Sequence, residues 1–266
     1  MHADEANKLS DWKETDTSAL QGLLDFLVLV SKQEQKCHVL LGTADDFMVD
    51  WLVQRGLRGD QYSALSLGDL DKDDAKRYVY GTLLDEYHVP GLMLPSEVWP
   101  ELYALCGGNF GALRWTVSRA AASYQDADGV EAAWSYAFKQ KRVQAFTRMK
   151  LGFNPKNLAT RSGLKAAWTQ EQWFTVLEEL NSHPYHAVPE ERMAALLDDN
   201  GNGQGVLESL VRFNLLSLRR QSPLAFDLPP EVFTESGLGT VVVAPNAAAQ
   251  EYILCGSWKA MYKSAV

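Results

Sequence analysis

CHVLLGT, at residues 37–43, is a short and continuous apolar run that stops at Gly-Thr. It follows a polar break at residues 33–36, and a run of this length and composition predicts a β-strand buried on both faces. Before the break, residues 18–35 carry leucines and a valine at helical spacing, and Ser18 is the expected N-cap. A helix followed by a buried strand is therefore expected over the first forty residues.

The same alternation continues after the strand. Residues 44–55 again have the pattern of a helix, which Gly56 would close, and residues 62–67 alternate like a short strand. Helix, strand, helix and strand within the first 70 residues is the order typical of a parallel α/β sheet. In such a sheet, ligands bind at the carboxyl ends of the strands.

From Asp71 onward the pattern becomes helical throughout. Asp71 is the expected N-cap of the first of these helices, because acidic residues follow it in the first turn. The next helices are expected at about residues 96–105, at about 110–124 after the turn Cys106-Gly107-Gly108-Asn109, and at 130–150, where the chain is rich in aromatic and basic residues.

The last third has short amphipathic helices followed by strands. The helices are expected at residues 170–180, 189–197 and 206–213, and the strands at 215–219 and 224–228, with a turn at 221–223 between them. Three helices followed by a hairpin indicate a winged-helix arrangement.

Composition limits the classes of function. The 266 residues have 46% hydrophobic and 22% charged side chains and a net charge of −9, so a broad electrostatic attraction to nucleic acid is not expected. The cysteines Cys37, Cys106 and Cys255 are far apart, which disfavours a disulfide framework or a zinc site. The chain has no apolar segment of about 20 residues and no signal segment, so a cytoplasmic or nuclear location without membrane contact is expected.

The amino-terminal pair Asp4-Glu5 is the strongest candidate for chemistry. Two adjacent carboxylates are also compatible with a solvated acidic start of the chain. Beside a strand that ends in Gly-Thr, however, the pair has the composition that an ATPase needs. Asp4 would hold the Mg²⁺ shell, Glu5 would orient and deprotonate the attacking water, and the Thr43 hydroxyl would sense the γ-phosphate or that water.

These motifs resemble, in order, those of the AAA+-type P-loop ATPases, especially the archaeal and STAND-like branches and the ATPase modules of some Crinkler-type effectors. Residues 4–9 resemble the Walker B segment and residues 38–43 the sensor-1 strand. Asp69-Leu70 resembles the entry to the helical lid, and Cys106-Gly107-Gly108-Asn109-Phe110 the turn that opens the sensor-2 helix. A winged helix after the lid is usual in that branch.

The resemblance implies a mostly α-helical chain that uses Mg²⁺ and ATP. Its expected parts are an α/β remnant of the P-loop NTPase parallel sheet (1–70), an all-helical lid (71–125), a helical connector (126–168), a winged-helix domain (169–245) and a C-terminal tail segment (246–266). Besides Asp4, Glu5 and Thr43, the implied nucleotide-binding or arginine-finger candidates are Arg55, Arg58, Asn109 and Arg114. A solvated surface position is equally compatible with each arginine, and a helix C-cap with Gly107-Gly108.

The chain departs from this family in one important respect. It contains no G-x-x-x-x-G-K-[ST], and the glycine cluster at 201–205 lacks a lysine. The expected explanation is that the chain is the C-terminal portion of a longer ATPase and has negligible activity alone. Residues 1–70 are expected to behave poorly in isolation, whereas the winged unit could fold alone. A homo-oligomer, or the chain's own missing amino-terminal segment, would be the protein partner.

Two other functions compete with the ATPase. In the first, the winged helix binds DNA or a protein partner through Arg212, Arg219 and Arg220, although Glu208 on the same helix weakens the attraction to phosphate. In the second, a hydrolase uses His183 and His186, but no nucleophile-elbow motif accompanies them.

Overall fold

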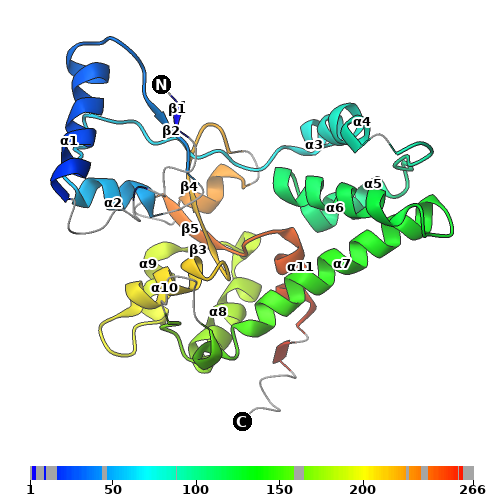
Figure 1. The fold of residues 1–266 in the computed structure, drawn as a ribbon. Helices are drawn as coiled ribbons and strands as arrows, with labels where there is room; N and C mark the ends of the chain where they lie inside the picture. Colours follow the sequence, from blue (N-terminus) through cyan, green and yellow to red (C-terminus); the bar gives the residue numbers. More distant parts are fainter. Residues whose placement is uncertain are drawn as a thin grey trace. The chain divides into compact units, whose positions relative to one another are not determined.

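The chain forms two compact units, Met1–Leu65 and Ser66–Val266, in the computed structural model (Figure 1). The structure describes residues 2–3, 9, 17–43, 47–87, 89–158, 165–225, 228–234, 239–256 and 258–259. Helices predominate among these residues, and the larger sheet has three antiparallel strands. The prediction of a mostly helical chain is therefore confirmed for the part that is described.

The first unit contains a small parallel sheet. Strand β1 (His2–Ala3) pairs in parallel with β2 (Leu40–Leu41), with His2 opposite Leu40 and Ala3 opposite Leu41. Between the two strands the chain forms α1 (Thr17–Val28), which a π-helical turn (Leu29–Gln33) continues, and α2 (Met48–Gln54) follows β2. The core of the unit consists of side chains from the two helices, namely Leu20, Leu24, Met48 and Leu52.

Three predictions for this unit are wrong. Ser18 lies inside α1, which already begins at Thr17, so it is not the N-cap. The strand at 37–43 is reduced to two residues, and Leu40 is 63% exposed rather than buried on both faces. Residues 62–67 form no strand, and Leu65 and Leu67 are 63% and 77% exposed. Leu40 is exposed because the ladder of β1 and β2 is only two residues long and no described layer covers it, whereas residues 62–67 pair with no described strand.

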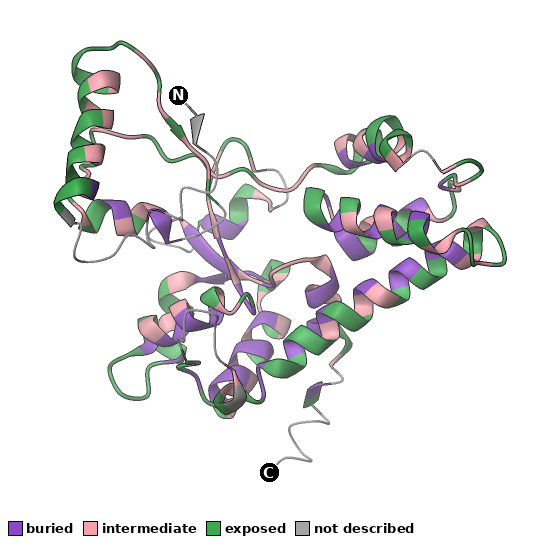
Figure 2. Cartoon of the chain, viewed as in Figure 1, coloured by how far each residue is buried: buried purple, intermediate pink, exposed green. Residues whose placement is uncertain are grey.

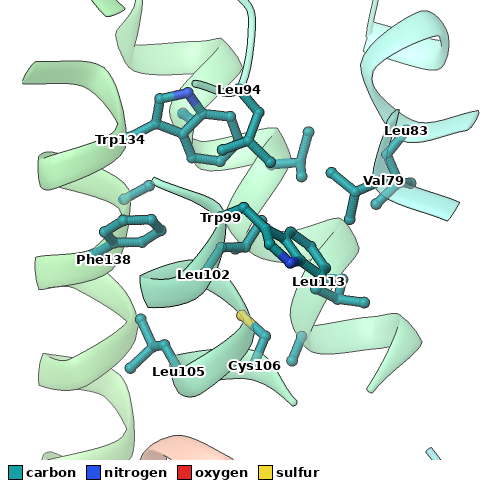
Figure 3. Close-up of a cluster of buried hydrophobic side chains, with 14 of the residues drawn as sticks. Val79, Leu83, Leu94, Trp99, Leu102, Leu105, Cys106, Leu113, Trp134 and Phe138 are labelled. Atoms are coloured by element: carbon teal, nitrogen blue, oxygen red, sulfur yellow. The ribbon is translucent and has the colours of Figure 1, made fainter. Parts of the chain in front are cut away.

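The second unit begins with a helical bundle. Its elements are α3 (Lys72–Tyr78), a π-helical turn (Val79–Leu83), α4 (Leu84–Tyr87), α5 (Trp99–Cys106), α6 (Phe110–Ser123) and α7 (Val130–Leu151). Asp71 caps α3 as predicted, because its side chain accepts hydrogen bonds from the backbone N–H groups of Asp73 and Asp74. Buried side chains from α3, the π-helical turn, α5, α6 and α7 form one core (Figure 3), and Leu84 and Tyr87 of α4 pack against it. The indole of the buried Trp134 donates to the carbonyl of Met93 at 2.9 Å.

The remaining elements combine short helices with the antiparallel sheet. They are a 3-10 turn (Pro155–Asn157), α8 (Gln170–Ser182), a 3-10 turn (Pro184–His186), β3 (Val188–Pro189), α9 (Glu190–Leu196), α10 (Gly203–Arg212), β4 (Ser217–Arg220), a 3-10 turn (Pro230–Phe233), β5 (Thr240–Val243) and α11 (Ala247–Cys255). The strand order is β3-β5-β4, and both pairings are antiparallel. A capping box formed by Thr169 and Gln172 begins α8.

The predicted hairpin has the wrong second strand. β4 pairs with β5, with Leu218 opposite Val242, and not with residues 224–228, of which 226–227 lie outside the described residues. Leu224 follows Pro223 in a turn and is exposed. The run Thr240–Val243 is β-branched throughout and mostly buried, so it fits a pleated interior strand better than the segment next to the proline does.

The predicted tail at 246–266 contains a helix that belongs to the core. Helix α11 packs against α5, α7 and α8. Tyr252 and Ile253 are among its buried residues, and Figure 2 colours the buried parts of the chain purple. The Arg142 guanidinium on α7 donates to Glu101 on α5 and to Glu251 on α11, at 3.0 Å in each case. The two halves of the second unit therefore share a core, which weighs against the expectation that residues 169–245 fold alone.

Tyr252 provides a test of this packing. Burial, and after it the negative charge of Cys255, raises the pKa of Tyr252 to about 12 from an ordinary value of 10.0. The pKa of Tyr252 is higher in the folded chain than in the unfolded chain, so its contribution to stability is fully present below pH 10. This contribution is lost as pH rises from 10 towards 12, because the tyrosine of the unfolded chain releases its proton first. For one proton the free energy of unfolding should fall by up to about 1.4 kcal/mol per pH unit.

Replacing Tyr252 with phenylalanine should remove this share of the pH dependence. Urea unfolding between pH 9 and 11 measures it, and the exposed Tyr136→Phe is the matched control. An equal alkaline loss of stability in the Tyr252→Phe variant and in the control would show that the Tyr252 hydroxyl is not buried in this core.

Candidate functional site

The parallel pair in the first unit defines the edge where the predicted ATPase residues should meet. Neighbouring parallel strands end at the same edge, so the chain leaves β1 after Ala3 and β2 after Leu41 on the same side. Thr43 lies two residues beyond β2 and is exposed. Asp4 and Glu5 lie outside the described residues. The carboxyl ends of β1 and β2 therefore lie side by side at one edge of the sheet. Of the three side chains assigned to catalysis there, only that of Thr43 is described.

The two candidate arginine fingers have different surroundings. The Arg55 guanidinium lies over the ring of Trp51, 5.1 Å from its centroid, and its Nε atom is buried without a hydrogen-bond partner. Arg58 is exposed and forms an ion pair with Asp60 at 3.3 Å. Arg58 therefore has the setting of a solvated surface charge, whereas Arg55 is held against its own helix by a cation–π contact.

The turn at 107–109 meets the segment that precedes α3. The Leu70 N–H donates to the Gly108 carbonyl at 3.0 Å, and the Asn109 amide donates to the Asp69 carboxylate at 3.1 Å. The Asn109 side-chain oxygen also accepts from the Ala112 N–H and so caps α6. The two motifs that suggested a lid are thus in direct contact, and Asn109 has a structural role in their junction.

Both glycines of this turn are explained by backbone geometry. Gly107 is the C-cap residue of α5 with φ +58°, a left-handed value that favours glycine. At Gly108 the constraint is contact, because a Cβ atom would overlap the carbonyl of Leu70. The C-cap interpretation of Gly107 is therefore confirmed, and Gly108 is required by the close approach of residues 69–70.

Arg114, the expected sensor-2 residue, forms an ion pair with Glu86 on α4, and both side chains are exposed. Hydrogen bonds to Tyr87 and Glu86 raise the pKa of this arginine. The contact joins α4 to α6 across the surface of the bundle. In this conformation, Arg114 is used for packing between helices.

The three arginines of the DNA-binding alternative do not share one surface of the sheet. Arg212 is exposed in the last turn of α10, while Arg219 and Arg220 are half-buried on β4, opposite Val241 and Thr240. Successive side chains of a strand point to opposite faces of the sheet, so Arg219 and Arg220 cannot both face the same groove of a nucleic acid.

The histidines of the hydrolase alternative interact with backbone carbonyls. The Nδ1 atom of His186 lies 3.0 Å from the carbonyl of Leu180, and that of His183 lies 3.2 Å from the carbonyl of Pro184. Within the described ranges, no group of three or more His, Cys, Asp or Glu side chains could hold a metal ion. Nor is any helix of these ranges both long and apolar enough to cross a membrane.

A cluster of cations around Trp115 was not predicted from the sequence. Arg119 on α6 and Lys141 on α7 both lie over the Trp115 ring, at 5.3 and 5.4 Å from its centroid. Next to them, Cys106 and Thr116 are buried and in contact through Sγ and Oγ1 at 3.2 Å, and burial raises the pKa of the Cys106 thiol. The four-residue spacing of Trp115 and Arg119 within a helix is the signal that sequence reasoning could have used.

The junction at Gly108 leads to a stability prediction. Gly108→Ala should lower the free energy of unfolding by about 1–3 kcal/mol, because the added methyl group displaces residues 69–70. The matched control is Gly111→Ala in the first turn of α6, where the nearest atom is the Asn109 side-chain oxygen at 3.5 Å. This control should be neutral or slightly stabilising. Urea unfolding measures both variants, and equal stability of the two would contradict the close approach.

Comparison of the chain with protein-family models, with curated proteins and with solved structures finds no match. The features of the chain that bear on its function are the parallel strand pair, the junction of residues 69–70 with 107–109, the strand order of the second unit and the cations around Trp115.

Proposed function

We propose that this chain is the C-terminal part of an AAA+-type ATPase in which hydrolysis of Mg-ATP drives a conformational switch. The observation that carries the proposal is the parallel pairing of β1 with β2. A β-strand, a helix and a parallel neighbouring strand form the unit from which nucleotide-binding sheets are built. In this proposal, residues 1–70 are the remnant of the P-loop core.

The chemistry assigned to this edge follows from its residue types. Oxygen donors suit Mg²⁺, so the Asp4 carboxylate would act through the water shell of the metal. The exposed Thr43 hydroxyl, two residues beyond β2, would sense the γ-phosphate or the attacking water. Glu5 would accept the proton of the attacking water as general base. When bound, Mg²⁺ neutralises the charge that develops on the phosphates.

The phosphate cradle would have to come from outside these 266 residues, because they contain no G-x-x-x-x-G-K-[ST]. Backbone N–H groups and the lysine of such a loop supply most of the attraction for the triphosphate. We therefore expect the chain alone to have negligible ATPase activity. A longer protein that supplies the loop would be active.

The second unit supplies the moving parts in this proposal. Helices α3–α6 would form the lid, with the junction of Asp69-Leu70 and Gly108-Asn109 as its base. Arg55, Arg58 and Arg114 would reach a nucleotide only by exchanging their present contacts with Trp51, Asp60 and Glu86. A nucleotide-dependent exchange of this kind would be the switch, because surface ion pairs are weak and cost little to break.

The elements from α8 to β5 support the winged-helix assignment. Their order is helix, strand, helix, helix, strand and strand, and the first strand joins the sheet formed by the last two. A hairpin following the third helix, with its loop at 221–239, would be the wing. The winged-helix region would then be a switch module packed on α7 of the helical connector, since Trp173 on α8 donates to the carbonyl of Met149 on α7.

The role of Glu5 can be tested in a protein that joins this chain to an upstream strand and P-loop. Glu5→Gln should bind ATP as the parent does and lose at least about 100-fold in turnover, the usual contribution of a general base. Glu34→Gln, an exposed carboxylate in the same unit, is the matched control and should leave turnover unchanged. Unchanged turnover in Glu5→Gln would remove Glu5 from this role. Turnover by the 266-residue chain alone would contradict the requirement for a P-loop.

Binding of DNA or a protein partner by the winged-helix region is the second candidate. The exposed Arg212 at the end of α10 favours it, since α10 would be the recognition helix. The acidic surroundings oppose it: Glu208 lies on α10, and Glu190 accepts a hydrogen bond from Gln204. The opposite orientation of Arg219 and Arg220 opposes it further.

A titration with duplex DNA at about 50 mM salt distinguishes the two functions, because electrostatic contacts are strongest there. We expect no binding by the parent chain. Binding that weakens in the Arg219→Ala/Arg220→Ala double variant would instead favour the DNA-binding alternative.

A further inference from the structure

Helices α6 and α7 pack against each other, and one cation from each helix lies over the same indole. Arg119 and Lys141 both lie over the indole of Trp115, with Arg119 Cζ 5.3 Å and Lys141 Nζ 5.4 Å from the ring centroid. Arg148 follows Lys141 by two helical turns on α7, and its charge reaches Lys141. We refer to Arg119, Lys141 and Arg148, with Trp115, as the α6–α7 cation cluster.

None of the three cations has a carboxylate partner among the residues that the structure describes. In the described part of the chain, Arg119, Lys141 and Arg148 form no ion pair with an acidic side chain. Their neighbours do: Arg114 on α6 pairs with Glu86, and Arg142 on α7 pairs with Glu101 and Glu251. In a chain with nine more acidic than basic charges, three adjacent cations without a carboxylate are a local excess of positive charge.

Lys141 is the residue for which this excess matters most. It is only 8% exposed, and a buried cation without an anion is unfavourable. Burial is the main cause that lowers the pKa of Lys141, and the charge of Arg148 adds to it, while the nearby Cys106 opposes both. The indole compensates for part of the lost hydration. Within the described residues, the Lys141 Nζ atom lies over the Trp115 ring and forms no ion pair, so its N–H groups are available as donors to an anion.

We propose that the α6–α7 cation cluster is a binding site for a small multivalent oxyanion of the phosphate class. Each guanidinium group can give paired hydrogen bonds to phosphate oxygens, and the Lys141 ammonium acts as a point charge. A polyphosphate chain carries enough negative charge to balance all three cations. The site belongs wholly to the second unit, so it is independent of the nucleotide chemistry proposed for residues 1–70.

The experiment is calorimetric titration of the full chain with inorganic tripolyphosphate at about 50 mM salt. One molecule should bind per chain, and affinity should fall about 10- to 100-fold in Lys141→Met and in Arg119→Gln, the range expected for loss of one charged hydrogen-bond donor. Lys139→Met removes the same charge from an exposed position of the same helix and should bind as the parent does. Arg119 is exposed, so its variant keeps the test valid if Lys141→Met perturbs folding.

Further titrations identify the source of the phosphate. Metal-free ATP that binds and loses affinity in the same two variants would extend the site to nucleotides, and inorganic tripolyphosphate alone would restrict it to free polyphosphate; either result supports the proposal. Three results would overturn it: no binding of tripolyphosphate, equal losses in Lys139→Met and Lys141→Met, or binding of duplex DNA without binding of tripolyphosphate.

Discussion

The parallel pairing of two very short strands determines where the first unit can carry chemistry. The register of His2 with Leu40 and of Ala3 with Leu41 fixes the direction of both strands, and α1 occupies the connection between them. The packing of α1 on α2, through Leu20, Leu24, Met48 and Leu52, holds that connection in place. If the strands were antiparallel, the residues after β1 and those after β2 would leave from opposite edges, and no shared site could form.

The second unit is organised around α7 and α11. Helix α7 contributes Trp134 and Phe138 to the bundle core, and its carboxyl end accepts a hydrogen bond from the indole of Trp173 on α8. Helix α11 returns to the same place and is tied by Glu251 to Arg142. A lid and a winged helix joined in this way would move as one body. We therefore expect the proposed switch to act at the base of the lid, where Gly108 contacts Leu70, rather than between α7 and α8.

Long periodic helices were predictable from the sequence, and short strands were not. The helix at 130–150 and the cap at Asp71 were found because their signals are local: apolar spacing, and an acidic residue before a helical run. The strand at 240–243 was missed because its partner, β4, lies twenty residues earlier, and the neighbouring apolar segment at 224–228 matched the hairpin pattern better. The sequence predicted Asn109 and Arg114 as nucleotide-binding candidates. Their contacts with Asp69 and Glu86 depend on tertiary packing, which the spacing of residues alone does not reveal.

Disulfide trapping of β1 on β2 tests the account most directly. With Cys37 and Cys255 replaced by serine, an Ala3→Cys/Leu41→Cys pair should form a disulfide under mild oxidation, because paired residues of adjacent strands lie within the distance that a disulfide spans. The control pair Ala3→Cys/Leu40→Cys should remain reduced, since its second cysteine points to the other face. Equal trapping of both pairs, or trapping of the control alone, would contradict the parallel register and with it the shared edge on which the ATPase proposal depends.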